Sequence, residues 1–153
     1  MIAYIFLGIL LVAVTVLIHA VGTSRWLSVL IARFAAAKAA ERPVNMLRIL
    51  ISTAVILLVL HTAQILLWAF AYLYLLPAAV LDTLEEAAYF SFVTFTTLGY
   101  GDVTLAGPWR IISGIEALNG ILLLGWSTAL LFAVVQRGWQ ETVQVNDTEQ
   151  ESE

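Results

Sequence analysis

The sequence predicts an all-α membrane protein with three membrane-spanning helices and one short helix that enters the membrane without crossing it. Hydrophobic residues make up 61% of the 153-residue chain, charged residues make up only 12%, and the mean hydropathy is +0.94. These values leave too little polar surface for a soluble globular domain. Apolar runs at residues 2–21, 49–76 and 108–136 can each span about 30 Å of hydrocarbon at about 1.5 Å per helical residue. The apolar run at residues 83–96 is too short to do so.

Residues 1–22 form the first predicted membrane helix. A cleaved signal peptide is the competing interpretation, but such a peptide begins with basic residues, and none precedes this run. A retained membrane helix is therefore expected. His19 lies near its end, and because no partner is visible in the sequence we interpret it as an interfacial side chain rather than a ligand.

Residues 23–48 form a basic connector between the first two membrane helices. Its bases outnumber its single acid, Glu41, and the positive-inside rule places such a loop in the cytoplasm. The basic residues are Arg25, Arg33, Lys38, Arg42 and Arg48. Trp26, Leu30 and Phe34 recur at helical spacing. This segment is therefore either an amphipathic helix on the inner membrane surface or a solvated or continuous helix.

Residues 49–76 form the second predicted membrane helix, which carries no charged residue and runs from the cytoplasm to the outside. Tyr72 and Tyr74, near its end, fit the outer aromatic belt. His61, Thr62 and Gln64 make a polar patch near the middle. Polar side chains inside membrane helices commonly bond to neighbouring helices. We favour that role for His61 over a pH sensor, because one isolated histidine gives little support for a sensor.

Residues 83–96 form the short helix. Asp82 is its predicted N-cap, and Glu85 follows at the spacing of a capping box. Because this helix must enter the membrane and stop, its C-terminal end points into the membrane. The macrodipole places roughly half a negative charge at that end, which favours a cation there.

Residues 97–101, Thr-Leu-Gly-Tyr-Gly, follow the short helix directly. Gly99 and Gly101 can adopt a positive φ at little steric cost. If left-handed residues alternate along this segment, successive carbonyl groups turn to one side, and such a row of oxygens can replace the hydration shell of a cation. One chain supplies one row, so a complete ring requires several chains.

Residues 96–102, Thr-Thr-Leu-Gly-Tyr-Gly-Asp, resemble the signature of the pore-loop potassium channels, which is Thr-x-Gly-Tyr-Gly preceded by Thr and followed by Asp. The motif also lies between the helices that its mechanism requires, over about residues 82–135. The alternative is a chance glycine-rich external turn. The resemblance implies a homotetramer in membrane lipid, with K⁺ as the transported ion and no other cofactor. It places the K⁺ ligands at the carbonyl groups of Thr97, Leu98, Gly99 and Tyr100, with Gly101 completing the selectivity filter and the Thr97 hydroxyl as the innermost ligand.

Four residues are predicted to support this filter. They are Thr96, Asp102, Tyr89 and Glu116. Leu98 stands where the family more often has Val or Ile, so the packing of its side chain differs. Some relatives carry a glutamate at the position of Val93 that steadies the filter. We therefore expect Tyr89 to brace Asp102 instead.

Glu116 is the one acidic residue in the middle of the last apolar run. An ionisable group within a membrane span is expected to have a partner. We expect hydroxyl or backbone groups of residues 94–97, or the Asn119 side chain, and a filter-supporting role. The alternative is a carboxylate that reaches up to the membrane interface.

Residues 108–136 form the last membrane helix, which by resemblance is the inner, pore-lining helix. Gly120 stands at the family's hinge position, although close helix packing is an equally good use of a glycine there. With Gly120 as the hinge, one helical face is expected to line the cavity. That face carries Ile121, Leu124, Thr128 and Phe132. Trp126 lies on the opposite side of the helix.

Residues 137–153 form a short acidic cytoplasmic tail, which we expect to be disordered from residue 146. The chain has no cysteine, and its two histidines are far apart in the sequence, so neither a metal cluster nor an enzyme is expected. No span carries the repeated arginines of a voltage sensor.

The predicted function is thus a potassium-selective channel of the plasma (cell inner) membrane, with a cytoplasmic C-terminus and no nucleic-acid partner. Two alternatives stay open. One is a weakly selective cation channel on the same scaffold, and the other is a structural or regulatory membrane subunit that conducts nothing.

Overall fold

The computed structural model describes residues 2–40, 42–75 and 81–150, and for residue 108 and residues 141–150 it describes the backbone alone. The elements are α1 (Ile2–Ala39), α2 (Met46–Leu75), α3 (Leu84–Phe95), a 3₁₀ turn (Gly107–Trp109) and α4 (Arg110–Gln150). These residues contain no strand. Three segments are long and apolar enough to cross a membrane, namely α1, α2 and the Arg110–Gln140 part of α4. The predicted all-α fold with three candidate spans is confirmed.

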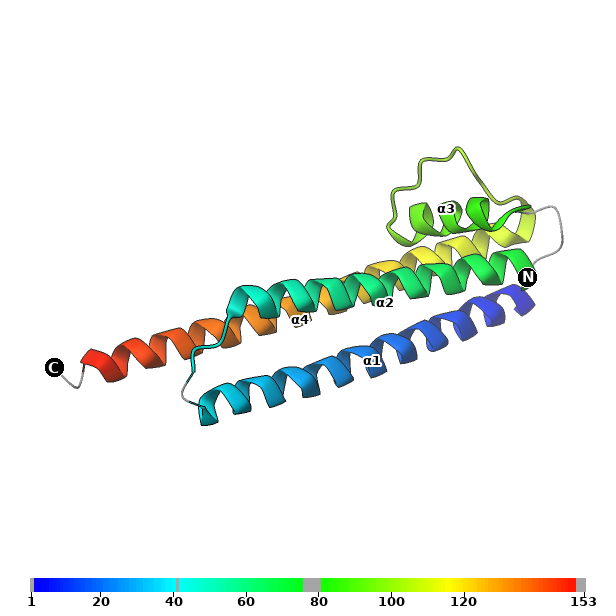
Figure 1. Cartoon of the computed structure of the whole chain (residues 1–153). Coiled ribbons are helices and arrows are strands. Elements are labelled where there is room, and N and C mark those ends of the chain that lie inside the picture. Colours follow the sequence, from blue (N-terminus) through cyan, green and yellow to red (C-terminus); the bar gives the residue numbers. More distant parts are fainter. Residues whose placement is uncertain (1, 41, 76–80, 151–153) are drawn as a thin grey trace.

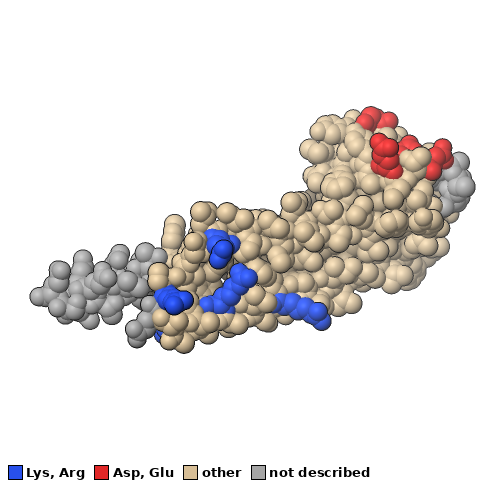
Figure 2. Space-filling model, viewed as in Figure 1, with Lys and Arg blue, Asp and Glu red and all other residues tan. Residues whose placement is uncertain are grey.

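The three long helices lie side by side and alternate in direction (Figure 1). The short helix α3 packs against α2 and α4 at the end of the bundle that holds the N-terminus. Acidic side chains gather around α3, and lysine and arginine gather toward the opposite end (Figure 2). The end opposite α3 is not purely basic, because α4 also carries Glu141, Asp147 and Glu149 toward it.

Helix α1 is longer than the predicted span of residues 1–22. At 1.5 Å per residue it is about 57 Å long, well beyond the thickness of the hydrocarbon. Its second half is not an amphipathic surface helix, because Trp26 and Leu30 are buried against Ile49 and Val134. The Trp26 indole also donates a hydrogen bond of 3.0 Å to Thr53 Oγ1. Of the two interpretations of the basic connector, the continuous helix is the one observed.

Helix α4 also extends beyond its predicted bounds of residues 108–136. It begins at Arg110, after the 3₁₀ turn, and continues to Gln150. The predicted disorder from residue 146 is therefore wrong for residues 146–150, whereas residues 151–153 lie outside the described part of the chain. Once a helix is nucleated each further residue adds a hydrogen bond, and glutamate and glutamine are good helix formers. Residues 76 and 77, at the predicted end of the second span, also lie outside the described residues.

The N-cap of α3 is Thr83 and not the predicted Asp82. Thr83 Oγ1 accepts a hydrogen bond from the Glu86 amide at 3.1 Å, and Glu86 Oε2 accepts one from the Asp82 amide at 3.2 Å. The N-cap bond of a capping box is present, shifted by one residue, and the Glu86 carboxylate reaches back to the amide of the residue before the N-cap. It fixes where α3 starts, and therefore where α3 delivers the residues that follow it.

Candidate functional site

The segment that follows α3 is anchored to the last turn of that helix. Thr97 N donates to Thr94 O at 3.0 Å, and Val93 O accepts from Leu98 N at 3.0 Å and from Gly99 N at 3.3 Å. Helix-end carbonyl groups have no partner within their own helix. Here they bind the first amides of residues 97–101, which we call the filter segment, so its position depends on α3.

The backbone of the filter segment is left-handed at every second residue. The φ angles are 60° at Thr97, 57° at Gly99 and 80° at Gly101. Positive φ was predicted for the two glycines, but Thr97 gave no such signal, since a β-branched residue rarely adopts it. Strain of this kind persists only where the surroundings impose it, and it clusters at functional sites.

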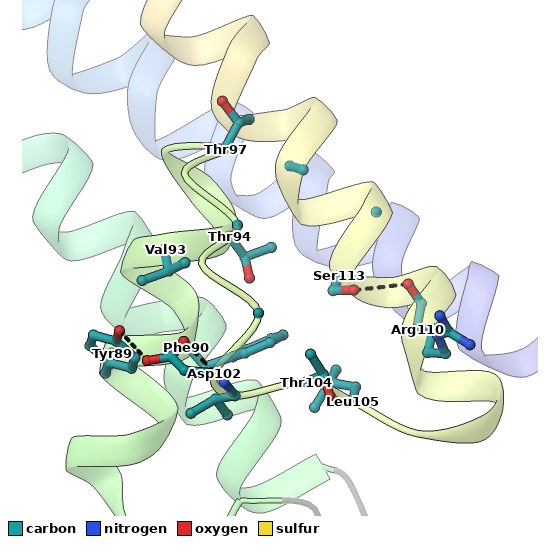
Figure 3. Close-up of a pocket in the computed structure, with 15 residues that line it drawn as sticks. Tyr89, Phe90, Val93, Thr94, Thr97, Asp102, Thr104, Leu105, Arg110 and Ser113 are labelled. Carbon is teal, nitrogen blue, oxygen red and sulfur yellow. Dashed lines mark hydrogen bonds between the residues drawn. The ribbon is translucent and has the colours of Figure 1, made fainter.

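The filter segment lies at the edge of the chain, with a hollow of about 440 Å³ between it, α3 and the start of α4 (Figure 3). Residues 96–102 are all exposed within one chain. The Tyr100 side chain is 68% exposed. The rest of the chain therefore leaves this segment uncovered.

Tyr89 and Asp102 join α3 to the far end of the filter segment (Figure 3). Tyr89 Oη donates a hydrogen bond of 2.6 Å to Asp102 Oδ2, and the Val103 amide donates to Asp102 Oδ1 at 3.0 Å. The Tyr89 hydrogen bond lowers the pKa of the Asp102 carboxyl, and the same bond raises the pKa of the Tyr89 hydroxyl. The expected contact between the two side chains is present.

Glu116 is completely buried, and its partner is one that the sequence did not indicate. Tyr72 Oη on α2 donates a hydrogen bond of 2.6 Å to Glu116 Oε2. The predicted partners are wrong, because Asn119 donates instead to Thr15 Oγ1 on α1 at 2.9 Å. The alternative of a carboxylate at the membrane interface is also excluded by this burial. Tyr72 is itself buried rather than part of an aromatic belt.

The Tyr72 ring also links this carboxylate to α3. It packs edge-on against Phe90 of α3, with ring centroids 5.2 Å apart. Glu116 of α4, Tyr72 of α2 and Phe90 of α3 thus form one continuous contact across three helices.

Gly120 allows α4 to pass against the end of α3. A Cβ atom at Gly120 would lie 1.9 Å from Phe95 O and 2.8 Å from Phe95 C. No other residue fits at this distance from a backbone carbonyl group. Of the two interpretations of Gly120, close packing is the one that the geometry supports, and α4 is a continuous helix through this position.

The predicted cavity face of α4 is exposed. Ile121, Leu124, Thr128 and Phe132 are all exposed within one chain. Trp126, expected on the opposite side, packs edge-on against the His19 ring of α1, with centroids 5.6 Å apart. The four residues thus lie on a face that this chain leaves uncovered.

The two histidines are neighbours, contrary to the prediction that they are isolated. Their ring centroids are 5.3 Å apart, and both rings contact Ser127 of α4. His19 is completely buried and is not an interfacial side chain. The signal in the sequence that could have paired them is the depth of each residue in its own span.

A protein-family model described as "Ion channel" matches residues 61–137, which is half of the chain. The match covers the C-terminal half of α2, α3, the filter segment and α4 as far as Arg137. None of the curated proteins compared with the chain matches it. With its three candidate spans, the chain is a multi-pass integral membrane protein. On this match and this architecture, the chain belongs to the ion channel family, whose pore module consists of two membrane helices and the segment between them.

Proposed function

We propose that this chain forms a homotetrameric, potassium-selective channel that conducts K⁺ passively through a filter built from residues 97–101. The observation that carries the proposal is the left-handed conformation at Thr97, Gly99 and Gly101 within the sequence Thr-Leu-Gly-Tyr-Gly. Alternating handedness turns successive carbonyl groups to one side, where they can replace the hydration shell of K⁺. Conduction makes no covalent bond, so no enzymatic activity is proposed.

Several chains are needed to complete the filter. One chain offers one row of carbonyl groups on an exposed segment, and four rows around an axis make a ring. The cavity face of α4 would line the same axis, with Phe132 near the inner end as a hydrophobic constriction. The exposure of both surfaces in the single chain supports this assembly.

The proposed orientation follows from the charges. The basic end of the bundle faces the cytoplasm by the positive-inside rule, and the C-terminus lies there too. The α3 end then faces outward, so α3 dips back into the membrane as a pore helix. In this arrangement residues 1–22 and 23–48 are a membrane helix and its connector, residues 49–136 are the pore domain, and residues 137–153 are the tail. The acidic side chains around α3 would concentrate cations at the outer mouth.

The filter is tested by a glycine substitution with a matched control. Gly101→Ala should abolish selective potassium flux into liposomes, because a Cβ disfavours φ 80°. Gly107→Ala is the control, since Gly107 also has a positive φ and open space around it but lies outside the filter. It should conduct like the unmodified protein, which should pass K⁺ well ahead of Na⁺ and be blocked by Ba²⁺.

Other results would favour the alternatives. Equal permeability to potassium and sodium in the unmodified protein would indicate the weakly selective cation channel and refute selectivity. A stable monomer that passes no ion would indicate the non-conducting subunit, because a monomer cannot form the ring.

The buried carboxylate is proposed to support the filter through α3. Glu116→Gln should retain conduction, whereas Glu116→Ala should weaken selectivity or the tetramer. Tyr72→Phe should act in the same direction, because it leaves a buried carboxylate without its donor. Tyr74→Phe is the control, since Tyr74 is exposed on the same helix. If Glu116→Ala leaves selectivity and tetramer stability unchanged, the carboxylate has no such role.

The cavity face is tested with cysteines, in a chain that has none of its own. Cysteine at Thr128 should react with water-borne thiol reagents, and cysteine at Trp126 should not. The reverse pattern would show that the proposed cavity face of α4 is wrong, because a different side of the helix would then line the water-filled path.

A further inference from the structure

Four polar side chains from three helices meet in the interior of the bundle, and we call them the histidine cluster. They are His19 of α1, His61 and Gln64 of α2, and Ser127 of α4. All four are buried. Gln64 Nε2 lies 3.1 Å from His19 Nδ1, and Ser127 Oγ lies 3.4 Å from His19 Nε2 and 2.8 Å from His61 Nε2.

The partners fix the direction of each hydrogen bond. Gln64 Nε2 also lies 3.4 Å from Thr15 O, which can only accept, so the amide nitrogen faces His19. His19 Nδ1 is then an acceptor, and the proton of the neutral ring is on Nε2, which donates to Ser127 Oγ. The Ser127 hydroxyl donates in turn to His61 Nε2. The neutral His61 ring therefore carries its proton on Nδ1.

The histidine cluster can accept one proton without losing its contacts, and it accepts it at His61. A proton on His19 Nδ1 would oppose the Gln64 amide donor. A proton on His61 Nε2 leaves Ser127 as the acceptor of two hydrogen bonds, which its two lone pairs allow, with its own hydrogen turned toward the α4 backbone. A second proton is repelled by the first, because the rings are only 5.3 Å apart in an apolar setting.

Other charged groups lie far from the two rings along every helix that packs against them. Distances along each helix axis follow from the rise of about 1.5 Å per residue. On α1 the nearest charged residue is Arg25, about 9 Å from His19, and on α2 it is Arg48, about 20 Å from His61. On α3 it is Glu86, about 14 Å from Phe95, and on α4 the nearest are Glu116 and Arg137, about 16 Å and 15 Å from Ser127. Phe95 of α3 packs against the His61 ring. A proton taken up here therefore lacks a nearby carboxylate, so its charge acts directly on the contact between α1, α2 and α4.

We propose that His19, Ser127 and His61 form a single intramembrane proton-binding site that ties α1 and α2 to α4. The regulatory consequence rests on the proposed channel function. Ser127 directly precedes Thr128 of the cavity face. A change in the hydrogen bonds of Ser127 therefore changes the position of that face relative to the pore axis. This gives α1 a role in controlling the pore.

The site can be tested by spectroscopy without any ion flux. With ¹⁵N-labelled histidine and a purification tag that lacks histidine, the spectrum of the full chain contains only two imidazole rings. At neutral pH one ring should be the Nε2–H tautomer and the other the Nδ1–H tautomer, assigned as His19 and His61 from single His→Gln variants. Acidification should protonate the rings in two steps, at least about one pH unit apart.

The decisive variant removes the Ser127 hydroxyl, which both histidine rings contact. Ser127→Ala should leave His61 as a mixture of tautomers, whereas Ser127→Thr should restore its pure Nδ1–H form because it keeps the hydroxyl. His19 should keep its Nε2–H form in both variants, because Gln64 still donates to its Nδ1. Ser52→Ala is the control, since the Ser52 hydroxyl bonds only to the backbone of its own helix. Two rings with free-imidazole tautomer mixtures, or spectra unchanged by Ser127→Ala, would overturn the proposal.

Flux measurements test the regulatory consequence separately. Between neutral pH and about pH 5, potassium flux should change about fivefold or more, the lower range of typical coupling between sites. His61→Gln keeps a hydrogen-bonding group at the position of Nε2 but does not titrate, so its flux should lack that change. An identical pH profile in both proteins would overturn the regulatory role. If the chain passes no potassium at all, the proposed function fails, and the spectra alone decide the proton site.

Discussion

Gly120→Ala is the substitution for which the structure makes the sharpest prediction. The added Cβ would lie 1.9 Å from Phe95 O, whereas ordinary contacts begin near 3.4 Å, so α4 and the end of α3 must separate by roughly 1.5 Å. The obstacle is a backbone carbonyl group, which cannot rotate away as a side chain does. The strain therefore falls on the helix end that holds the first residues of the filter segment.

The expected cost is at the upper end of the range for overpacked interiors, about 3 kcal/mol. The purified protein in detergent should melt at a lower temperature than the unmodified protein. In liposomes, Gly120→Ala should lose discrimination between K⁺ and Na⁺, because Val93 O holds both Leu98 N and Gly99 N on that same helix end.

Two glycines of the same helix provide the control. A Cβ at Gly114 or Gly125 meets no atom within 4 Å, so alanine there should be neutral or stabilising by about 0.5–1 kcal/mol. The same comparison separates packing from a hinge. A hinge residue should change the open probability and leave melting and selectivity intact. If Gly120→Ala melts and discriminates as Gly125→Ala does, the packing argument is refuted.

Two further predictions concern the end of the bundle that holds α3. Tyr89→Phe removes the hydrogen bond that lowers the pKa of Asp102, so that pKa should rise toward its ordinary value. At a pH above the ordinary carboxyl pKa, Asp102 is ionised and the contact with Tyr89 is present. The contact is lost as the pH falls through the lowered pKa of Asp102, where the carboxylate takes up a proton. Acid inhibition of potassium current should therefore begin at a higher pH in Tyr89→Phe, and an unshifted midpoint would contradict this. In the second prediction, cysteines at Gly8 and Ile115 should form a disulfide within one chain, because an ideal Cβ at Gly8 lies 3.5 Å from Ile115 Cβ, within the range that disulfides require. Non-reducing electrophoresis should show loss of free thiol without dimers, and crosslinked dimers would mean that α1 packs on a neighbouring chain.

The short helix and the filter segment could be predicted because their signals are local. The predicted bounds of residues 83–96 agree with α3 and its two caps, Thr83 and Thr96. A helix too short to cross the membrane, followed by alternating glycines, has few possible conformations. Length, capping residues and glycine spacing act within a few residues of each other, so one sequence is enough to recognise them.

The helix ends at the side of the bundle away from α3 were predicted less well, because charged residues do not by themselves end a helix. The basic residues after residue 22 suggested a connector, yet Ala-rich sequence and the buried Trp26 and Leu30 keep α1 helical to Ala39. In the same way α4 runs into its polar tail. Hydropathy marks where the apolar run stops, and the backbone hydrogen bonds of the helix continue past that point.

The contacts between helices were missed because periodicity tells which residues share a face, but not which faces meet. Depth in the membrane supplies the missing information. Counted at 1.5 Å per residue from the end of each helix on the α3 side of the bundle, His19 and Ser127 both lie about 26 Å deep and His61 about 21 Å deep. The same count places Glu116 about 9 Å deep and Tyr72 about 5 Å deep.

Polar residues of different spans therefore pair when they lie at a similar depth. A polar group in hydrocarbon must find a partner, and antiparallel helices can offer one only at a similar depth. That rule excludes His61 as the partner of Glu116, and it also selects Ser127 and His19 as the partners of His61. Each polar residue of a span is then a constraint on how the helices pack, which an apolar residue at the same position would not supply.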